Sequence, residues 1–162
     1  MIQLENVSVK YGNSVALHPV SLDIKDSQFT VLLGSSGAGK STFLRCLNLM
    51  NPLHGGNIRV TGFEGGWRKR ALQMLRRETG MIFQQHQLIE RQTALQNVLM
   101  GRLGYHSFFR TLFPLSPAEQ ELGLHCLKRV GLLDKALCRV DELSGGQQQR
   151  VGIARVLAQQ PK

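Results

Sequence analysis

A glycine-rich stretch in the first half of the chain has the residue types that bind phosphate groups. Residues 34–42 fit the spacing Gly-x-x-x-x-Gly-Lys-[Ser/Thr], which is typical of loops that hold nucleoside triphosphates. Glycines allow a nest of inward-pointing backbone N–H groups, and a helix that begins near Lys40 adds the positive end of its dipole. Lys40 suits the β- and γ-phosphates, the Ser41 hydroxyl suits Mg²⁺, and Thr42 suits the α-phosphate. The predicted nucleotide-binding residues of this loop are Gly34, Ser35, Ser36, Gly37, Ala38, Gly39, Lys40, Ser41 and Thr42. The alternative is a Gly/Ser turn that only joins a strand to a helix.

A second glycine-containing segment stands directly before a helical sequence near the end of the chain. Leu143–Gln147 reads Leu-Ser-Gly-Gly-Gln and precedes the helical run Gln148–Arg155. A serine cap followed by two glycines is another helix start with exposed backbone donors, which suits an anion. Taken alone, the segment fits a loop glycine pair equally well.

Composition limits the classes of protein to which the chain can belong. It has 162 residues, of which 42% are hydrophobic and 19% charged, so we expect one folded domain, or one plus an appendage. No apolar run is long enough to cross a bilayer and the start lacks a secretory signal, so a cytosolic chain is expected. The histidines are scattered, and no metal-binding spacing occurs among the cysteines, which are Cys46, Cys126 and Cys138.

Positive charge is in excess and is concentrated in one short segment. Lys and Arg number 20 against 11 Asp and Glu, a formal net charge of +9, which permits an anionic partner such as nucleic acid, a membrane surface or a phosphate-bearing ligand. We interpret the cluster as the solvated face of a helix, with a phosphate-binding track as the alternative. The cluster consists of Arg68, Lys69, Arg70, Arg76 and Arg77.

Hydrophobic patterning predicts the elements that position the first glycine-rich loop. Ile2–Val9 and Val20–Ile24 alternate apolar and polar residues, and the turn formers of Tyr11–Ser14 between them predict an antiparallel pair of strands. Phe29–Leu33 is a short apolar run that ends directly before the loop, as a buried parallel strand would. The helix that follows the loop is expected to run to Met50.

Further along the chain, the pattern changes from strands to helices. Asn57–Val60 and Met81–Phe83 are predicted strands, with the basic helix between them. From Thr93 onward the pattern is helical, and a last helix is expected to run from Ser144 to about Gln159.

One helix in this second half has clear start and stop signals. Ser116–Glu119 has the spacing of a capping box, with proline at the first helical position. Gly131 is a suitable stop for this helix. The helix places three apolar residues on one face, namely Leu122, Cys126 and Val130.

Taken together, these motifs resemble the ATP-binding subunits of ABC transporters. Leu143–Gln147 matches the family's signature motif in every letter, and Gly34–Thr42 matches its Walker A loop. Tyr11 stands where the family places an aromatic residue that stacks on adenine, although ordinary packing at a strand end also suits a tyrosine. Gln84 stands at the family's Q-loop glutamine, which contacts the metal site and the membrane partner. The resemblance extends over residues 2–162 with the motifs in order.

Within that family, the chain is most similar to the ATPase subunits of phosphonate importers. The similarity lies in Gly80–Gln85, Asn97–Tyr105 and Leu143–Arg150. Gly101–Tyr105 is the most discriminating part, and it lies in the helical insert, which in such proteins faces the transmembrane partner. Polar amino-acid importers share most of the other features.

The resemblance implies an α/β fold in which a P-loop NTPase core carries an N-terminal antiparallel β subdomain and an ABC-type helical insert. Residues 1–92 would form the β subdomain and core, residues 93–143 the helical subdomain, and residues 144–162 the signature helix. Family members continue into a strand that ends in Asp-Glu and supplies a metal ligand and the catalytic base. We therefore expect a C-terminally truncated chain, whose core sheet is incomplete and which hydrolyses ATP poorly by itself.

The resemblance also implies the function. It is that of an ATPase subunit, with Mg²⁺ as cofactor, which energises an importer of phosphonates from the cytoplasmic face of the inner membrane. Expected partners are transmembrane permease subunits, a solute-binding protein and a second ATPase subunit, and nucleic acid is not expected. The implied catalytic residues are Lys40, Gln84 and Ser144, and the metal ligands are Ser41 and Gln84. Nucleotide contacts beyond the first loop are assigned to Tyr11, Ser144, Gly145, Gly146 and Gln147.

Three other functions stay open at this stage. The chain could bind ATP without turnover, as a fragment or remnant that lacks the catalytic base. It could serve another importer, such as one for polar amino acids. It could also be a soluble ABC protein of translation or DNA repair, in which the positive charge would meet nucleic acid.

Overall fold

The computed structural model describes residues 1–63, 69–84, 87–106 and 115–162, so Arg68 and Gln85 of the predictions lie outside the described residues. The chain divides into two units, Met1–Leu75 and Arg76–Lys162, and each is described by itself. The subdomain boundaries expected at residues 92/93 and 143/144 stay predictions.

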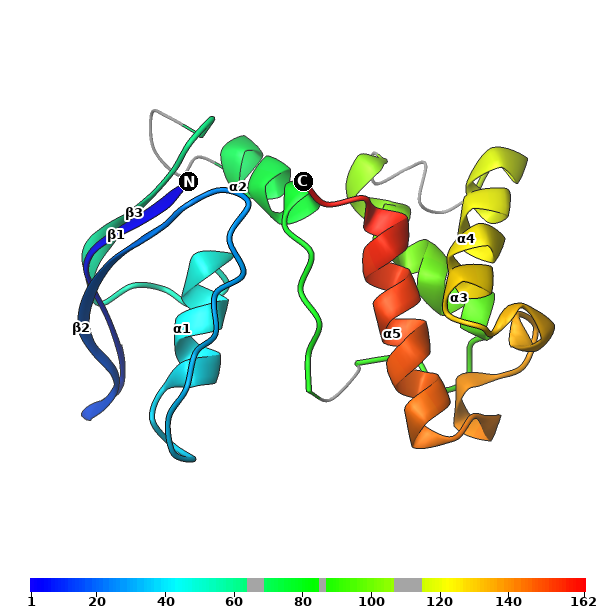
Figure 1. The fold of residues 1–162 in the computed structure, drawn as a ribbon, viewed down its shortest axis with the longest axis horizontal. Coiled ribbons are helices and arrows are strands. Elements are labelled where there is room, and N and C mark those ends of the chain that lie inside the picture. Colours follow the sequence, from blue (N-terminus) through cyan, green and yellow to red (C-terminus); the bar gives the residue numbers. More distant parts are fainter. Residues whose placement is uncertain (64–68, 85–86, 107–114) are drawn as a thin grey trace. The chain divides into compact units, whose positions relative to one another are not determined.

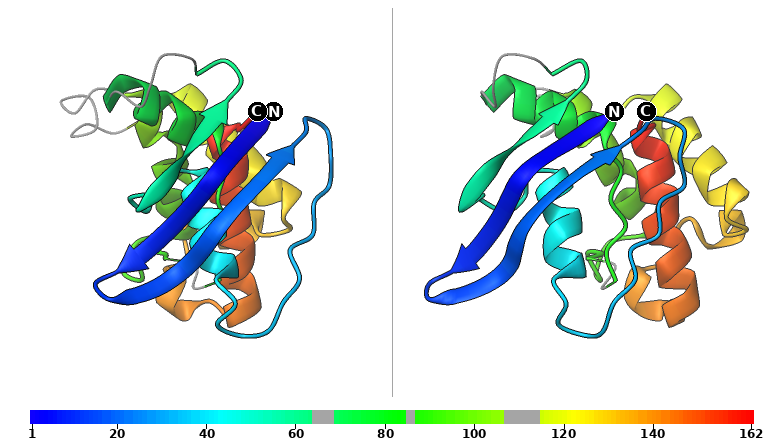
Figure 2. Two further views of the ribbon diagram at one scale, coloured as in Figure 1. Left: turned by 90° about the vertical axis from the view of Figure 1, so that its left-hand side faces the viewer. Right: turned by 60° about the vertical axis from the view of Figure 1, so that its left-hand side comes forward.

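The N-terminal unit is built on an antiparallel sheet. Its strands are β1 (Ile2–Tyr11), β2 (Ser14–Ile24) and β3 (Gly55–Val60), in the order β2-β1-β3 (Figures 1 and 2). β1 pairs with β2 through a tight hairpin in which Tyr11 faces Ser14, and Gly12 takes the positive φ of 57° that the turn requires. The predicted antiparallel pair is therefore confirmed, and the predicted third strand extends back to Gly55.

Helix α1 (Lys40–Leu47) supplies the other half of the apolar core in this unit. Phe43 and Cys46 from the helix are buried together with the inward-facing strand residues Leu4, Val7, Val9, Leu17 and Ile58. The helix ends at Leu47 rather than at Met50, because Asn48 caps it and Leu49 takes a positive φ of 47°.

Two predicted strands are wrong, namely Phe29–Leu33, which was predicted as a parallel strand, and Met81–Phe83. Phe29–Leu33 and Met81–Phe83 have no strand structure, and the Phe29 and Ile82 side chains are 94% and 54% exposed. A parallel strand exists only where neighbouring strands supply backbone partners and helices cover its faces. None of the strands in the described part of the chain pairs with either segment, so their apolar composition alone does not produce a strand.

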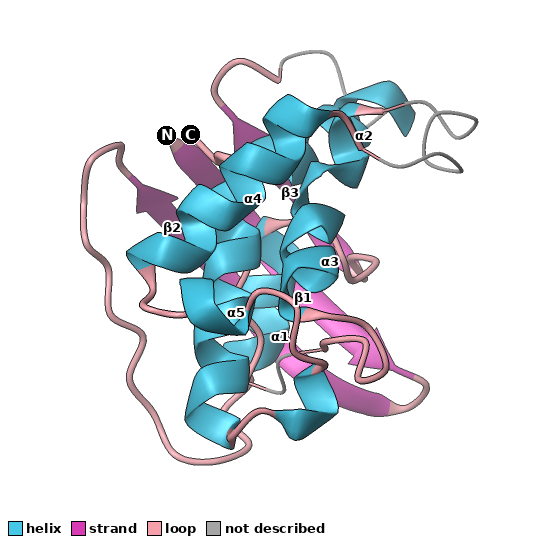
Figure 3. Ribbon diagram, turned by 90° about the vertical axis from the view of Figure 1, so that its right-hand side faces the viewer, coloured by secondary structure: helices cyan, strands magenta, loops and turns pink. Residues whose placement is uncertain are grey.

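The C-terminal unit is helical in its described parts (Figure 3). It contains α3 (Ala94–Leu99), the 3₁₀ helix η1 (Met100–Tyr105), α4 (Pro117–Arg129) and α5 (Gly145–Gln159). Two short 3₁₀ turns, η3 (Leu133–Lys135) and η4 (Val140–Glu142), connect α4 to α5. The basic helix α2 (Lys69–Glu78) is confirmed over its described residues and reaches into this unit with its last turn.

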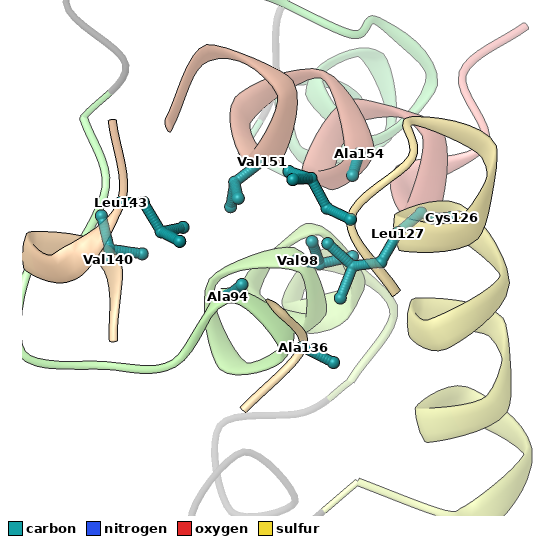
Figure 4. Packing of buried hydrophobic residues seen from close by; sticks show 11 residues of the cluster. Ala94, Val98, Cys126, Leu127, Ala136, Val140, Leu143, Val151 and Ala154 are labelled. Atoms are coloured by element: carbon teal, nitrogen blue, oxygen red, sulfur yellow. The ribbon is translucent and has the colours of Figure 1, made fainter. Parts of the chain in front are cut away.

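The core of the helical unit lies where α3, α4 and α5 meet. Figure 4 shows side chains from the three helices pointing toward one another. The labelled members from these helices are Ala94, Val98, Cys126, Leu127, Val151 and Ala154. The predicted apolar face of α4 is confirmed, because Leu122 and Val130 pack against the same cluster as Cys126.

The predicted cap of α4 is also confirmed, and the structure adds one that was not predicted. Ser116 accepts a hydrogen bond from the N–H of Glu119 at the start of α4, and Gly131 follows the helix with a φ of +70°. Thr93 forms the same capping box with Gln96 at the start of α3. The Thr-x-x-Gln spacing carried that signal in the sequence.

No helix within the described ranges is both long enough and apolar enough to span a membrane.

Candidate functional site

The glycine-rich loop passes directly into helix α1, as its sequence predicts. Gly39 is the N-cap of α1 in the left-handed conformation, with φ 83° and ψ 6°, and no side chain caps the helix start. A Cβ on Gly39 would come within 2.8 Å of the Ala16 carbonyl oxygen on β2, so the loop lies too close to the strand for any larger residue. The helix therefore begins with backbone donors that no side chain of its cap satisfies.

Lys40 lies over the loop that precedes it. Its Nζ donates hydrogen bonds to the carbonyl oxygens of Gly34, at 2.7 Å, and Ser35, at 2.6 Å. The loop is tightened by a turn in which the Ala38 N–H bonds to the Ser35 carbonyl at 3.3 Å. The positive charge is thus held within the loop, where an incoming phosphate could compete with neutral carbonyl acceptors for it.

The other predicted contacts of the N-terminal unit lie on or near these elements. Ser41 is exposed and Thr42 half-buried in the first turn of α1. Gly37 has a φ of +83°, and a Cβ there would meet no heavy atom within 4 Å. Tyr11 ends β1 with its side chain 51% exposed, which leaves the ring accessible. These residues fit a bound Mg²⁺–nucleotide: bare helix donors, an ammonium and a free-standing hydroxyl are the groups that such a ligand needs.

The second motif forms the start of α5, in the other unit. The Ser144 hydroxyl accepts a hydrogen bond from the Gln147 N–H at 3.4 Å, and the Gln147 side-chain oxygen accepts one from the Ser144 N–H at 2.9 Å. This is a complete capping box. Gly145 and Gly146 are exposed, and a Cβ on either would meet no heavy atom within 4 Å. The glycines are not required by packing within the chain, so open space above them is the feature that a ligand could use.

Gln148 and Leu143 anchor this helix start, and sequence reasoning assigned no role to Gln148. Its side-chain nitrogen donates to the carbonyl oxygens of Val140, at 3.0 Å, and Leu143, at 3.1 Å. The Leu143 side chain is buried in the helical core. These contacts hold the last residues before the motif against α5, so the exposed Ser-Gly-Gly segment stands on a rigid support.

Gln84 lies in the same unit as Ser144, at a bend after residues 79–83, which have no regular secondary structure. It is exposed, as a residue that binds a ligand or a partner must be. The structure therefore places the nine loop residues and Tyr11 in the N-terminal unit, and it places Gln84 and the signature residues in the C-terminal unit.

The Gly101–Tyr105 stretch is tied to the C-terminal end of α5. Arg102 donates to the Ala158 carbonyl at 3.3 Å, and the Tyr105 hydroxyl donates to the Gln159 carbonyl at 2.8 Å. The Arg102 guanidinium also stacks 3.9 Å from the centroid of the Tyr105 ring. Arg102 and Tyr105 therefore stabilise the helical unit itself. The role of this stretch in determining the identity of the partner stays a prediction.

A small charged cluster extends from Arg102 to the start of α4. Glu119 accepts a hydrogen bond from His106 at 2.6 Å and lies 3.6 Å from the Arg102 guanidinium. Burial raises the pKa of Glu119, whereas hydrogen bonds with His106 and with the Ser116 N–H lower it. The lowering outweighs the raising, so the pKa is below its ordinary value. The capping carboxylate of α4 is therefore held in its charged form.

Among the residues that the structure describes, no three His, Cys, Asp or Glu side chains come together in a way that could hold a metal ion.

Comparison with known proteins assigns the chain to a family. The sequence profile of the ABC transporter family matches residues 17–162, which is most of the chain. The chain therefore belongs to the ABC transporter family of ATP-binding proteins.

Curated relatives narrow the similarity. The chain is 58% identical over its whole length to the phosphonates import ATP-binding protein PhnC 1 of Trichodesmium erythraeum, of which it covers 65%. It is 60% identical to PhnC 3 of Nostoc sp., of which it covers 62%. It is 57% identical over 99% of its length to the phosphite import ATP-binding protein PxtA of Stutzerimonas stutzeri, of which it covers 58%. The chain thus spans about three fifths of the length of these relatives.

Solved structures confirm the fold. The dimeric post-hydrolysis state of the ATP-binding cassette MJ0796, bound to ADP and Pi, superposes with a TM-score of 0.83 at 35% identity, over 99% of this chain and 71% of that one. The cbiO1 protein of Clostridium perfringens, part of the ABC transporter complex cbiONQ, gives a TM-score of 0.77 at 27% identity, over 99% of this chain and 62% of that one. The predicted fold class, a P-loop ABC cassette with an incomplete sheet, is confirmed.

Proposed function

We propose that this chain is the nucleotide-binding part of an ATPase that energises an importer of phosphonates or of a related phosphorus oxyanion such as phosphite. The observation that carries the proposal is the occurrence of two glycine-rich helix starts, at Gly39 and Ser144, in one chain of the ABC transporter family. The curated relatives that are 57–60% identical to it over the aligned residues are import ATP-binding proteins for phosphonates and phosphite, which supports the class of cargo.

ATP binds in this proposal at the start of α1. The backbone N–H groups of Gly34–Thr42 surround the phosphates, and Tyr11 stacks on the base. The Lys40 ammonium exchanges its loop carbonyls for phosphate oxygens, a stronger pairing because the acceptor is charged. Ser41 is the residue of this helix start that would hold Mg²⁺, which would neutralise charge on the phosphates when bound.

Two copies close head to tail in the active state. Ser144, Gly145, Gly146 and Gln147 of one copy then cap the γ-phosphate that is held by the other copy's loop. The exposed glycines of this helix start support that role, since the space above them is open. The likeness to a dimeric cassette bound to ADP and Pi supports the same arrangement.

In turnover, Lys40 of one copy and Ser144 of the other copy stabilise charge on the same γ-phosphate from opposite sides. Gln84 contacts the membrane subunits. No general base for the attacking water is assigned to a residue of this chain. Permease subunits and a solute-binding protein complete the importer, and the ATPase binds peripherally at the cytoplasmic face of the membrane.

Dimer formation provides the test of the proposal. Ser144→Arg should leave ATP binding by a single copy within twofold of wild type. It should abolish ATP-dependent dimerisation in sedimentation velocity, because a long cation fills the space that the γ-phosphate needs. Ser116→Arg removes the matching cap of α4 and is the control, which should still dimerise. ATP-dependent dimers of the Ser144→Arg variant, or no ATP binding by the wild-type protein, would refute the proposal.

A further inference from the structure

The C-terminal half of α5 holds the backbone on the upstream side of Gln84. The side-chain nitrogen of Gln159 donates to the carbonyl oxygens of Arg76, at 2.8 Å, Arg77, at 3.0 Å, and Thr79, at 3.0 Å. Arg76 and Arg77 lie in the last turn of α2 and Thr79 follows it directly, and the last carbonyls of a helix have no partner within the helix itself. One amide from α5 therefore caps the helix that leads into residues 80–84.

Close packing reinforces this contact. A Cβ on Gly80 would lie 2.5 Å from a Val156 methyl carbon of α5 and 2.9 Å from a Pro161 ring carbon. The Lys162 N–H donates to the Glu78 carbonyl at 3.0 Å. The chain that leads to Gln84 therefore lies directly against α5, without room for a side chain between them.

The downstream side of Gln84 is held by the same helix. The guanidinium of Arg155 donates to the carbonyl oxygen of Gln87 at 2.9 Å. Arg155 is half-buried, and burial lowers the pKa of its guanidinium. Arg155 and Gln159 lie four residues apart and thus on one face of α5. This face therefore binds the backbone before Gln84, at residues 76–79, and after it, at Gln87. We call these two stretches and Gln84 the Gln84 segment.

The end of α5 is itself fixed in place. The carbonyls of Ala158 and Gln159 accept hydrogen bonds from Arg102 and Tyr105 of η1. The Gln159 backbone is therefore held on one side while its side chain reaches the α2 carbonyls on the other.

We propose that Gln159, together with Arg155, is a positioning residue that fixes the Gln84 segment to the helix that begins at Ser144. α5 is one uninterrupted helix of 15 residues, about 22 Å long at 1.5 Å per residue, and it is capped at Ser144. A displacement of its start by a γ-phosphate on the second copy therefore moves the backbone on both sides of Gln84 as one body. The side chains of Gln159 and Arg155 thus couple the contact of Ser144 with the γ-phosphate to the contact of Gln84 with the membrane subunits. The consequence for turnover rests on the proposed function. The tether, by which we mean the hydrogen bonds of Gln159 and Arg155 to the backbone around Gln84, does not rest on it.

Hydrogen exchange tests the tether without any ATPase activity. In Gln159→Leu, the amides of residues 76–84 should exchange about tenfold faster, because the α2 carbonyls lose their cap. Peptides from α4 should keep wild-type exchange, which shows that the fold is intact. Gln73→Leu, the same change at an exposed position of α2, is the matched control and should leave residues 76–84 unchanged. Wild-type exchange at residues 76–84 in Gln159→Leu, or equal acceleration in Gln73→Leu, would overturn the proposal.

Steady-state kinetics of the assembled importer test the consequence. Gln159→Leu should lower kcat about tenfold while the KM for ATP stays within twofold, since the ATP-binding loop is not touched. Gln159→Glu, which keeps the size but replaces the amide donor by a carboxylate oxygen that only accepts hydrogen bonds, should behave alike. A raised KM with unchanged kcat would contradict the positioning role. Absence of ATPase activity in the wild-type assembly would instead refute the proposed function and the coupling role. The hydrogen bonds of Gln159 to residues 76–79 would still be tested independently by hydrogen exchange.

Discussion

The two glycine-rich helix starts look alike in sequence but differ in how their backbone donors are used. At α1, Gly39 is a cap without a side chain, and the adjacent Lys40 ammonium bonds to loop carbonyls. At α5, Ser144 and Gln147 satisfy each other's backbone N–H groups in a complete capping box. The first helix start is open and charged, and the second is closed and neutral.

This difference explains why the two sites play unequal parts in the proposed mechanism. An open nest with a lysine binds a polyphosphate by itself, because the anion replaces neutral acceptors and takes the helix donors. A self-capped helix start is stable without a ligand, and the donors that it offers to an anion are the backbone N–H groups of Gly145 and Gly146. It therefore adds to a phosphate that another copy already holds, rather than recruiting one.

The largest expected effect comes from removing the charge at the open site. Lys40→Ala should weaken ATP binding by about a hundredfold or more, since a charge-assisted contact to two phosphates is lost. Binding of a fluorescent ATP analogue measures it. Lys25→Ala, at an exposed turn, is the control and should bind as wild type does. Tight binding by Lys40→Ala would mean that the two helix starts do not differ in the way described.

Adding a methyl group to one glycine at each site should give opposite results for stability. Gly39→Ala places a Cβ 2.8 Å from the Ala16 carbonyl at a positive φ, and should lower the free energy of unfolding by about 2 kcal/mol. Gly146→Ala enters open space in a helix and should raise it by up to about 1 kcal/mol. Urea denaturation compares the two variants. Equal losses would show that the glycines at α5 are structural after all.

Removing the cap at α5 should cost less than the change at Gly39. Ser144→Ala should lower the free energy of unfolding by about 1 kcal/mol, because the Gln147 N–H loses its acceptor. Ser116→Ala removes the equivalent cap of α4 and should cost a similar amount, measured by the same denaturation. A Ser144→Ala variant as stable as wild type would imply that the capping box does not form in solution.

The smallest effect separates the two capping boxes by pH. The pKa of Glu119 in the folded protein is lower than its ordinary value of about 4.3. Its contribution to stability is therefore complete above about pH 4.3 and is lost as the pH falls through the lower folded value. The α5 box uses the neutral Gln147 and has no such dependence. Glu119→Gln should flatten the acid limb of a plot of stability against pH, whereas Glu121→Gln, at an exposed position, should not. An unchanged acid limb in Glu119→Gln would contradict the lowered pKa.

Sequence reasoning succeeded where the structure depends on residues that are close in the chain. The hairpin at Tyr11–Ser14, the loop into α1 and the caps at Ser116 and Ser144 are set by neighbours within a few positions. Glycine conformation, side-chain caps and alternating polarity act over that same short range. The ABC signature could likewise be recognised because it is one contiguous motif.

Other features required partners that a local pattern does not specify. Phe29–Leu33 has the composition of a buried strand but is exposed, because a strand needs neighbours to supply its hydrogen bonds. The roles of Gln148 and Gln159 also could not be predicted, since a glutamine in a helix carries no signal of its acceptors. The carbonyls that Gln159 binds are more than seventy residues earlier in the chain, at separations of 80, 82 and 83 residues.

The sequence by itself therefore determined the family, the two phosphate-binding motifs and the local geometry of each helix start, because backbone conformation and capping are short-range. Only the tertiary structure decided that α5 holds the backbone on both sides of Gln84, because those contacts exist only after distant parts of the chain have packed together.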